Sequence, residues 1–167
     1  VAGHRRTAAP TGNLDFMMGR KVLSYPSLGE TPILFVQIVH PDTGQARIFQ
    51  MLVDTGATKT CLPAHFAASF GHDNRHPLVK KTIARGLGDS SQAFVHTLKV
   101  ALIDPEATEQ EKLRTFWTSP VMPVLFAEKM TTKFGLLGRD VLAQWQQICF
   151  RPMAGNPAPF WTIEITL

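Results

Sequence analysis

The sequence predicts an all-β domain with one short helix near its C-terminus. Apolar, strand-like segments recur along the chain, and Gly, Pro, Asn and Asp mark the turns between them. With 167 residues, of which 44% are hydrophobic and 18% are charged, the chain is large enough to enclose one core. We expect this domain to occupy residues 31–167.

The first part of the chain predicts an extension, a hairpin and a short helix. Residues 1–30 are rich in Gly, Pro, Ser and Thr without clear periodicity, so we expect an N-terminal arm or extension. Ile33–Val39 is an apolar strand, and Pro, Asp and Gly at 40–45 predict a turn. Ala46–Val53 returns as the second strand of the hairpin. Ala64–Phe70 follows a proline and suits a short helix.

The second part predicts another hairpin and a C-terminal pair of strands. Residues 79–84 and 92–103 are expected to be strands joined by a turn at 86–91, because 92–103 alternates between apolar and polar side chains. Residues 160–167 also alternate, which suits an edge strand with an apolar face that a second chain can cover. The remaining expected elements are strands at 114–118, 122–126 and 147–151 and a helix at 139–145.

The most informative segment is 51–58, where an apolar strand runs into Asp54-Thr55-Gly56-Ala57. This pattern is typical of a carboxylate held on a tight loop at the end of a buried strand. Thr55 offers a hydroxyl that can fix the loop, and Gly56 lets another backbone approach because it has no Cβ. Asp54 is therefore the candidate catalytic residue, and an aspartate that only stabilises a turn is the alternative.

Three segments together resemble one enzyme family. Asp54-Thr55-Gly56-Ala57-Thr58 resembles the active-site loop of the retropepsins, the retroviral-type aspartic proteases. Residues 134–142, FGLLGRDVL, resemble the family's apolar-apolar-Gly-Arg segment and its short helix, and residues 84–88 lie where the family has a glycine-rich flap. The features occur in the family's order across about residues 33–151. The resemblance implies a retropepsin-like closed β barrel and an aspartic-type endopeptidase.

The resemblance also implies roles for residues that support the active-site loop. Thr55 matches the residue whose hydroxyl braces two active-site loops against each other, and Gly56 matches the position whose backbone meets the substrate. Ala57 continues the same loop. Gly138 matches the glycine behind the catalytic loop, where a side chain would collide. The flap residues that would contact substrate are Arg85, Gly86, Leu87 and Gly88, although the glycines also suit an ordinary hairpin turn.

One position departs from the family pattern. Arg139 matches an arginine that in retroviral enzymes pairs with an acid shortly after the catalytic triplet. Thr58 and Lys59 stand where such acids often occur, so Arg139 needs another partner. Asp140, carbonyl groups of the Asp54 loop and a residue of a second chain are all open.

The sequence predicts a homodimer. A second Asp-Thr-Gly triplet at 42–44 follows His40-Pro41 and suits a hairpin turn, which leaves Asp54 as the candidate catalytic carboxylate. A facing pair then requires two chains related by a two-fold axis. Two carboxyls about 3 Å apart share a proton, so the ionised one can activate water and the protonated one can hydrogen-bond the scissile carbonyl. This mechanism acts on a polypeptide substrate and needs no cofactor.

Two other functional assignments stay open. A catalytically silent retropepsin-fold domain for peptide binding or dimerisation is the alternative, although the intact Asp54-Thr55-Gly56 argues against it. A protease domain cut from a larger protein, such as a polyprotein or a ubiquitin-shuttle type protease, is also possible. The sequence does not determine the cleavage preference, the host or any processing of the arm. A cytoplasmic protein or a soluble domain of a larger protein is the expectation.

Composition and spacing argue against several other classes. The net charge is +4 and the pI is near 9.3, but Lys and Arg are scattered, which predicts a solvated basic surface and not a nucleic-acid site. No apolar run approaches the ~20 residues of a membrane-spanning helix. Cys61 and Cys149 are expected to be free thiols, and the spacing of His and Cys predicts no metal site.

Overall fold

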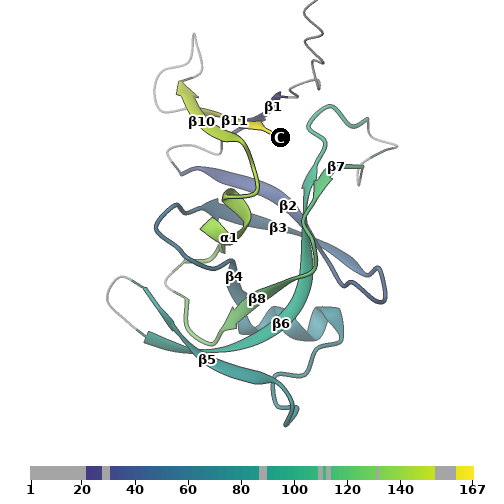
Figure 1. Cartoon of the computed structure of the whole chain (residues 1–167), viewed down its shortest axis with the longest axis vertical. Coiled ribbons are helices and arrows are strands. Elements are labelled where there is room, and N and C mark those ends of the chain that lie inside the picture. Colours follow the sequence, from purple (N-terminus) through teal and green to yellow (C-terminus); the bar gives the residue numbers. More distant parts are fainter. Residues whose placement is uncertain are drawn as a thin grey trace, which may run out of the picture.

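The computed structural model describes residues 22–27, 31–86, 90–108, 111, 114–130, 132–152 and 161–167. Over these residues the chain forms a barrel-like sheet with a smaller sheet at one end (Figure 1). The strands of the large sheet are β2 (Ile33–Val39), β3 (Ala46–Val53), β4 (Cys61–Pro63), β5 (Lys80–Arg85), β6 (Ser90–Ile103), β7 (Thr115–Thr118), β8 (Met122–Ala127) and β9 (Gly135–Leu137). Two short helices, η1 (Ala64–Phe70, a 3-10 helix) and α1 (Arg139–Leu142), accompany them.

The large sheet closes on itself. Its strands follow the order β2-β3-β9-β4-β8-β6, and the second half of β2 pairs antiparallel with β6, from Val36 opposite Leu102 to Val39 opposite Lys99. Among the described strands, six therefore form a ring, and β5 and β7 pair with β6 outside it. The predicted all-β closed barrel with a short helix near the C-terminus is confirmed.

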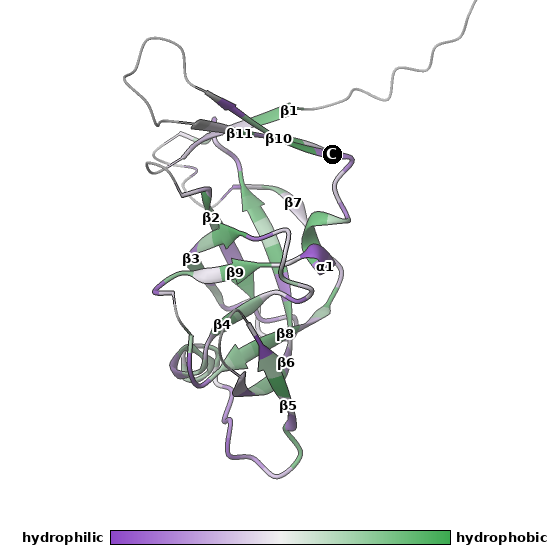
Figure 2. Ribbon diagram, turned by 90° about the vertical axis from the view of Figure 1, so that its left-hand side faces the viewer, coloured by the Kyte–Doolittle hydropathy of each residue, from purple (hydrophilic) through white to green (hydrophobic). Residues whose placement is uncertain are grey.

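Apolar side chains fill the barrel. Val36 and Ile38 of β2, Met51 of β3, Leu98 of β6 and Phe126 of β8 are all fully buried. Figure 2 shows these strands as mainly hydrophobic. Removing a side chain of this size from water contributes about 1.5–3 kcal/mol, so the core holds the strands that carry the candidate loop in fixed positions.

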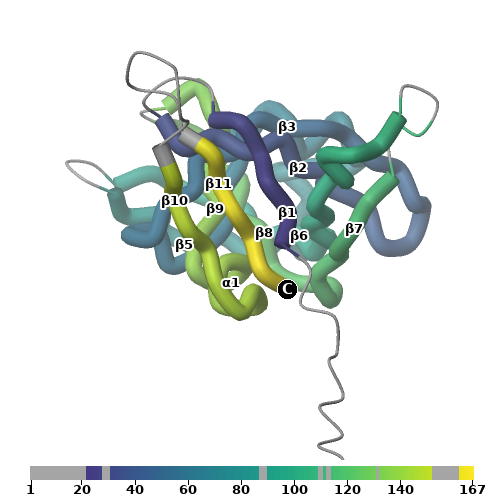
Figure 3. Tube along the Cα trace, turned by 90° about the horizontal axis from the view of Figure 1, so that it is seen from above, coloured from purple at the N-terminus to yellow at the C-terminus, as the bar shows by residue number. Residues whose placement is uncertain are grey.

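The smaller sheet consists of β1 (Val22–Pro26), β11 (Trp161–Thr166) and β10 (Gln147–Pro152), which lie side by side in Figure 3. Leu23 of β1 and Ile163 and Ile165 of β11 belong to the same buried cluster as the barrel core. The hydroxyl of Tyr25 donates a 2.8 Å hydrogen bond to the carbonyl of Ile103, which ties this sheet to β6.

Several elements differ from the expectations. The prediction of an edge strand at 160–167 is wrong, because β11 pairs with β1 on one side and with β10 on the other. Val22–Pro26, inside the segment expected to be an arm, forms β1 because β11 offers it a partner distant in sequence. The helix expected at 139–145 ends at Leu142. The three-residue strands β4 and β9 were too short to give a periodic pattern.

Candidate active site

The Asp54 loop begins where two parallel strands end together. β3 and β9 pair in parallel, with Val53 opposite Leu137, and the backbone N–H of Asp54 donates to the carbonyl of Leu137 at 3.1 Å. Val53 is held on its other side by a 2.8 Å hydrogen bond to the carbonyl of Pro32. The chain therefore leaves the buried end of β3 at a fixed point, and Asp54 is the first residue beyond it.

The loop fixes the carboxylate of Asp54. Its Oδ1 accepts hydrogen bonds from the backbone N–H groups of Gly56 at 2.8 Å and Ala57 at 3.1 Å. Asp54 is half-buried, whereas Thr55 and Gly56 are exposed. No described residue donates a hydrogen bond to Oδ2 of Asp54. One carboxylate oxygen is thus anchored to the backbone, and the other remains available for chemistry.

A buried polar network supports the loop from behind. Thr60 is completely buried, and its hydroxyl donates to Oδ1 of Asp140 at 2.8 Å and accepts from the N–H of Gly138 at 3.2 Å. The backbone N–H of Thr60 donates to the same carboxylate at 2.9 and 3.1 Å. The N–H of Arg139 donates to the carbonyl of Ala57 at 2.9 Å. These bonds join the Asp54 loop to the start of α1.

Gly138 lies in close contact with the backbone of the loop. A Cβ added at Gly138 would lie 2.5 Å from the carbonyl carbon and 2.7 Å from the oxygen of Lys59, and 2.8 Å from the nitrogen of Thr60. Because backbone atoms cannot move aside as a flexible side chain can, no larger residue fits there without displacing the loop. The packing of β9 and α1 against the loop therefore depends on a glycine.

The side chain of Arg139 does not pair with Asp140. The Asp140 carboxylate is occupied by Thr60, and Arg139 is exposed. Within the described part of the chain, no carboxylate forms an ion pair with Arg139. Asp140 is therefore excluded as the partner of the Arg139 side chain. A carbonyl of the Asp54 loop, that of Ala57, accepts a hydrogen bond from the backbone N–H of Arg139 and not from its side chain.

A cavity of about 580 Å³ lies beside the loop. Residues 56–59 of the loop form one side, and residues 83–86 at the end of β5 form another. Asp54 does not line this cavity, but Gly56 and Ala57, which donate to its carboxylate, do. The volume lies within the ~300–1,000 Å³ typical of ligand sites. The loop and the first part of the expected flap therefore face a common space.

The expected flap residues are only partly described. Arg85 ends β5 and Gly86 follows it, and both line the cavity. Leu87 and Gly88 lie outside the described residues. β5 and β6 pair antiparallel from Lys80 opposite Val95 to Arg85 opposite Ser90, and the Arg85–Ser90 end of this hairpin is the end at the cavity. This hairpin lies at the opposite end of the barrel from the smaller sheet (Figures 1 and 2).

Asp42 lies far from Asp54. The two residues flank the eight-residue strand β3, which separates them by roughly 26 Å at about 3.3 Å per residue. Asp42 occupies the turn between β2 and β3, where its N–H donates to Nδ1 of His40 at 3.2 Å. The second triplet therefore cannot supply a facing carboxylate from the same chain.

Sequence reasoning missed Thr60 and the role of Asp140. A buried threonine gives no pattern in a sequence, and Asp140 was considered only as a partner for its neighbour Arg139. The one available signal was a polar residue, Thr60, directly before the apolar pair Cys61-Leu62. Both residues of that pair are buried, so a polar side chain beside them needed an internal partner.

The described residues contain two free thiols and no cluster of potential metal ligands. Cys61 lines the cavity but is buried, and burial raises its pKa to about 11. Cys149 is half-buried and is also free. Within the described ranges, no group of three His, Cys, Asp or Glu side chains is placed to hold a metal ion. No described helix is long and apolar enough to cross a membrane.

Three histidines stack outside the cavity. The rings of His40 and His72 lie 4.9 Å apart and those of His72 and His96 4.3 Å apart. His96 is buried, and its Nε2 is 2.8 Å from Oδ1 of Asn74. Burial, with the neighbouring His72, lowers the pKa of His96 to about 4, and burial with the neighbouring His40 lowers that of His72. His72 and His96 are therefore neutral near pH 7.

Structural comparison finds solved structures that are similar to this chain. The chain is similar to a retropepsin-like aspartic protease from Rickettsia conorii, with a TM-score of 0.49 and 13% identity over 88% of this chain and 94% of that one. It is also similar to EIAV protease complexed with the inhibitor HBY-793, with a TM-score of 0.45 and 22% identity over 70% of this chain and 89% of that one. No family model and no curated protein sequence matches the chain.

Proposed function

We propose that this protein is a homodimeric aspartic endopeptidase, in which the Asp54 carboxyl of each of two chains forms half of the active site. The observation that carries the proposal is the Asp54 loop itself. Oδ1 of Asp54 accepts hydrogen bonds from the backbone N–H groups of Gly56 and Ala57, while Oδ2 accepts none from the described residues. A carboxylate fixed in this way is positioned for proton transfer with little reorganisation.

The proposed reaction follows from a pair of such carboxyls. Two of them close together cannot both ionise, so they hold one proton between them. The ionised carboxyl takes a proton from a bound water, and the protonated one donates a hydrogen bond to the carbonyl oxygen of the peptide. The water then attacks the carbonyl carbon directly, and the proton passes to the leaving nitrogen. No covalent intermediate and no cofactor is needed.

Exposure of the loop supports the dimer. Thr55 and Gly56 are exposed although Met51 and Val53 at the end of the strand before them are buried, and Thr55 is at the position proposed to brace two loops. Arg139, at the start of the adjacent helix, is exposed and forms no ion pair within the described residues. A second chain related by a two-fold axis would cover this surface and place a second Asp54 opposite the first.

The test is a pair of substitutions at the proposed catalytic residue. Asp54→Asn keeps the size and leaves an oxygen to accept from Gly56 and Ala57, but an amide cannot exchange the proton. We expect peptide cleavage to fall by about 10⁴-fold, the upper end of the range seen when a residue acting in proton transfer is lost. Thermal unfolding, measured on the same preparations, should change little.

Mixing the variant with wild-type protein separates a dimeric site from a monomeric one. If each site needs two Asp54 residues, excess Asp54→Asn chains capture wild-type chains in inactive heterodimers, and activity falls well below that of the wild-type chains alone. Asp42→Asn is the matched control and should leave both cleavage and its concentration dependence unchanged. Undiminished cleavage by Asp54→Asn would refute the proposal.

A further inference from the structure

The cavity beside the Asp54 loop carries positive charge on several sides. Lys59 belongs to the loop, Arg85 ends β5 and Lys129 follows β8, and all three line the cavity. The three residues are exposed. No Asp or Glu among the described residues lines the same space.

These three cations are not neutralised within the described residues. The ion pairs of the described part of the chain involve only Arg114 and Arg151 as the positive partners. Glu128 is next to Lys129 in the sequence, but it does not line the cavity, and its Oε1 accepts a 3.3 Å hydrogen bond from Gln92. The cavity therefore presents positive charge that a ligand can complement.

Part of the cavity lining is apolar. Ile83 of β5, Leu125 of β8 and Leu136 of β9 contribute to its lining, and Ile83 is largely exposed for a residue of its size. A side chain that suits this space combines an aliphatic stem with a negatively charged end. Glutamate, and to a lesser extent aspartate, has this combination.

We infer that this cavity is a subsite for an acidic side chain, so that the protein selects peptides with Glu or Asp near the scissile bond. The inference rests on the proposed function and specifies its substrate class. In a symmetric dimer the cavity occurs twice. The preference for an acid is therefore expected at two positions, one on each side of the scissile bond.

The expected selectivity is set by exposed ion pairs. Each such pair contributes a factor of a few, because solvent and salt screen it, and three together give roughly 10-fold between Glu and Gln at the same position. The preference should weaken as salt is raised. It should also disappear below about pH 4, because the free glutamate carboxyl then becomes protonated.

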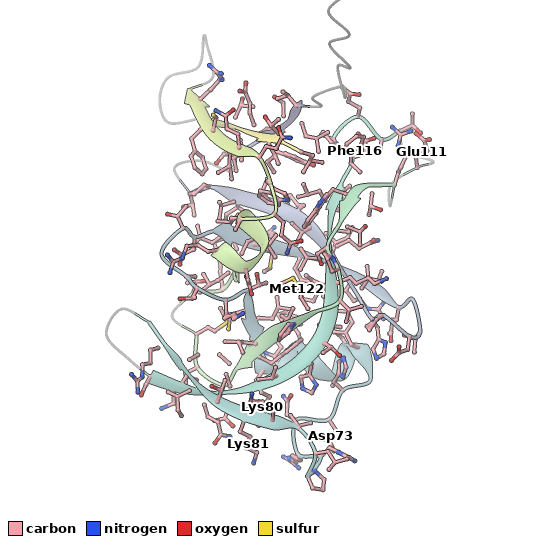
Figure 4. The ribbon with its side chains drawn as sticks, viewed as in Figure 1. Asp73, Lys80, Lys81, Glu111, Phe116 and Met122 are labelled. Carbon is pink, nitrogen blue, oxygen red and sulfur yellow. The ribbon has the colours of Figure 1, made fainter. Side chains whose placement is uncertain are left out.

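The experiment compares peptides that differ only in Glu or Gln at one position at a time. Wild-type kcat/KM should favour Glu roughly 10-fold at two positions in low salt, and Lys129→Gln should reduce that ratio several-fold. Lys80→Gln is the matched control, because it removes the same charge from β5 at a residue that does not line the cavity. Figure 4 labels Lys80 on this strand. Lys80→Gln should leave the ratio unchanged.

Binding to the Asp54→Asn variant separates this inference from the proposed function. Fluorescence anisotropy should show the Glu peptide binding more tightly than the Gln peptide, and Lys129→Gln in the same background should reduce the difference by a factor of a few. Cleavage with equal rates for Glu and Gln at every position would overturn the acidic subsite and leave the protease intact. Preferential binding of the Glu peptide without cleavage by wild type would overturn the protease and leave the subsite. Equal binding and no cleavage would overturn both.

Discussion

Replacing Gly138 with alanine tests whether the packing behind the Asp54 loop controls both stability and catalysis. The added Cβ would lie 2.5 Å from the carbonyl carbon of Lys59, whereas carbon atoms pack at about 3.5–4.0 Å. The loop and the start of α1 must therefore separate by roughly 1 Å. That separation acts on the hydrogen bonds from Gly138 to Thr60 and from Arg139 to Ala57.

The magnitude follows from overpacking against backbone. Forcing one extra methyl group into a close-packed site costs about 1–3 kcal/mol. In a domain of this size each kcal/mol lowers the melting temperature by about 2–4 °C, so Gly138→Ala should lower it by about 2–12 °C. A 1 Å displacement of a catalytic group can also lower turnover by about 100-fold. Loss of turnover should therefore exceed what the fraction of unfolded protein explains.

The assay is thermal unfolding beside peptide kinetics at a temperature where both proteins are folded. Gly86→Ala is the control for stability, because nothing lies within 4 Å of its added Cβ, and its melting temperature should match the wild type. Gly135→Ala is an intermediate case, because its Cβ meets mainly the movable side-chain end of Met51. A Gly138→Ala protein with wild-type stability and turnover would refute the reasoning.

Two further predictions follow from buried titratable groups. The folded state holds His96 neutral with a pKa near 4, below the ~6.5 of an unfolded chain, so its contribution is present above pH 6.5 and is lost as the pH falls towards 4. His96→Gln should reduce the dependence of the unfolding free energy on pH by up to ~1.4 kcal/mol per pH unit in that window. The free energies come from urea titrations at a series of pH values, and the same pH dependence in wild type and variant would contradict this. At pH 8 the Cys61 thiol, with a pKa of about 11, should be ionised roughly 100-fold less than at its ordinary pKa of 9.0. Iodoacetamide should therefore label the half-buried Cys149 before the buried Cys61 in mass spectra of native protein.

The sequence predicts those parts of the fold whose strands and turns have a recognisable local pattern of residues. The hairpin of Ile33–Val39 and Ala46–Val53 shows its apolar strands and its turn residues in sequence, and both strands have the expected bounds. β1 could not be found in this way, because Val22–Pro26 becomes a strand only through pairing with β11, far away in the chain. The same distant pairing explains why β11 is not an edge strand.

The candidate site was predictable as a motif but not as a network. Asp54-Thr55-Gly56 and Gly138 carry a resemblance that can be seen in the sequence. The link between Thr60 and Asp140 joins residues eighty positions apart, and no local pattern connects the two residues. The positive charge of the cavity could not be predicted from a local pattern either. Lys59, Arg85 and Lys129 are distant in sequence and line one cavity only because β3, β5 and β8 bring them together.

Acid has opposite effects on the histidine stack and on the proposed carboxyl pair. It lowers the stability of the folded protein through the histidines, and it supplies the proton that the carboxyl pair shares. A shared proton on two Asp54 residues requires acid, because raising the pH removes it and leaves two repelling charges. Acid also protonates the released histidines of unfolded chains and so draws protein out of the folded state. Activity should therefore rise as the pH falls only until the loss of folded dimer exceeds the gain in correctly protonated pairs. Because His96→Gln removes the His96 part of the second effect and leaves the first effect intact, it should extend activity to lower pH while leaving the alkaline limb of the rate profile in place. A shift of the alkaline limb would instead mean that His96 acts on the Asp54 pair itself.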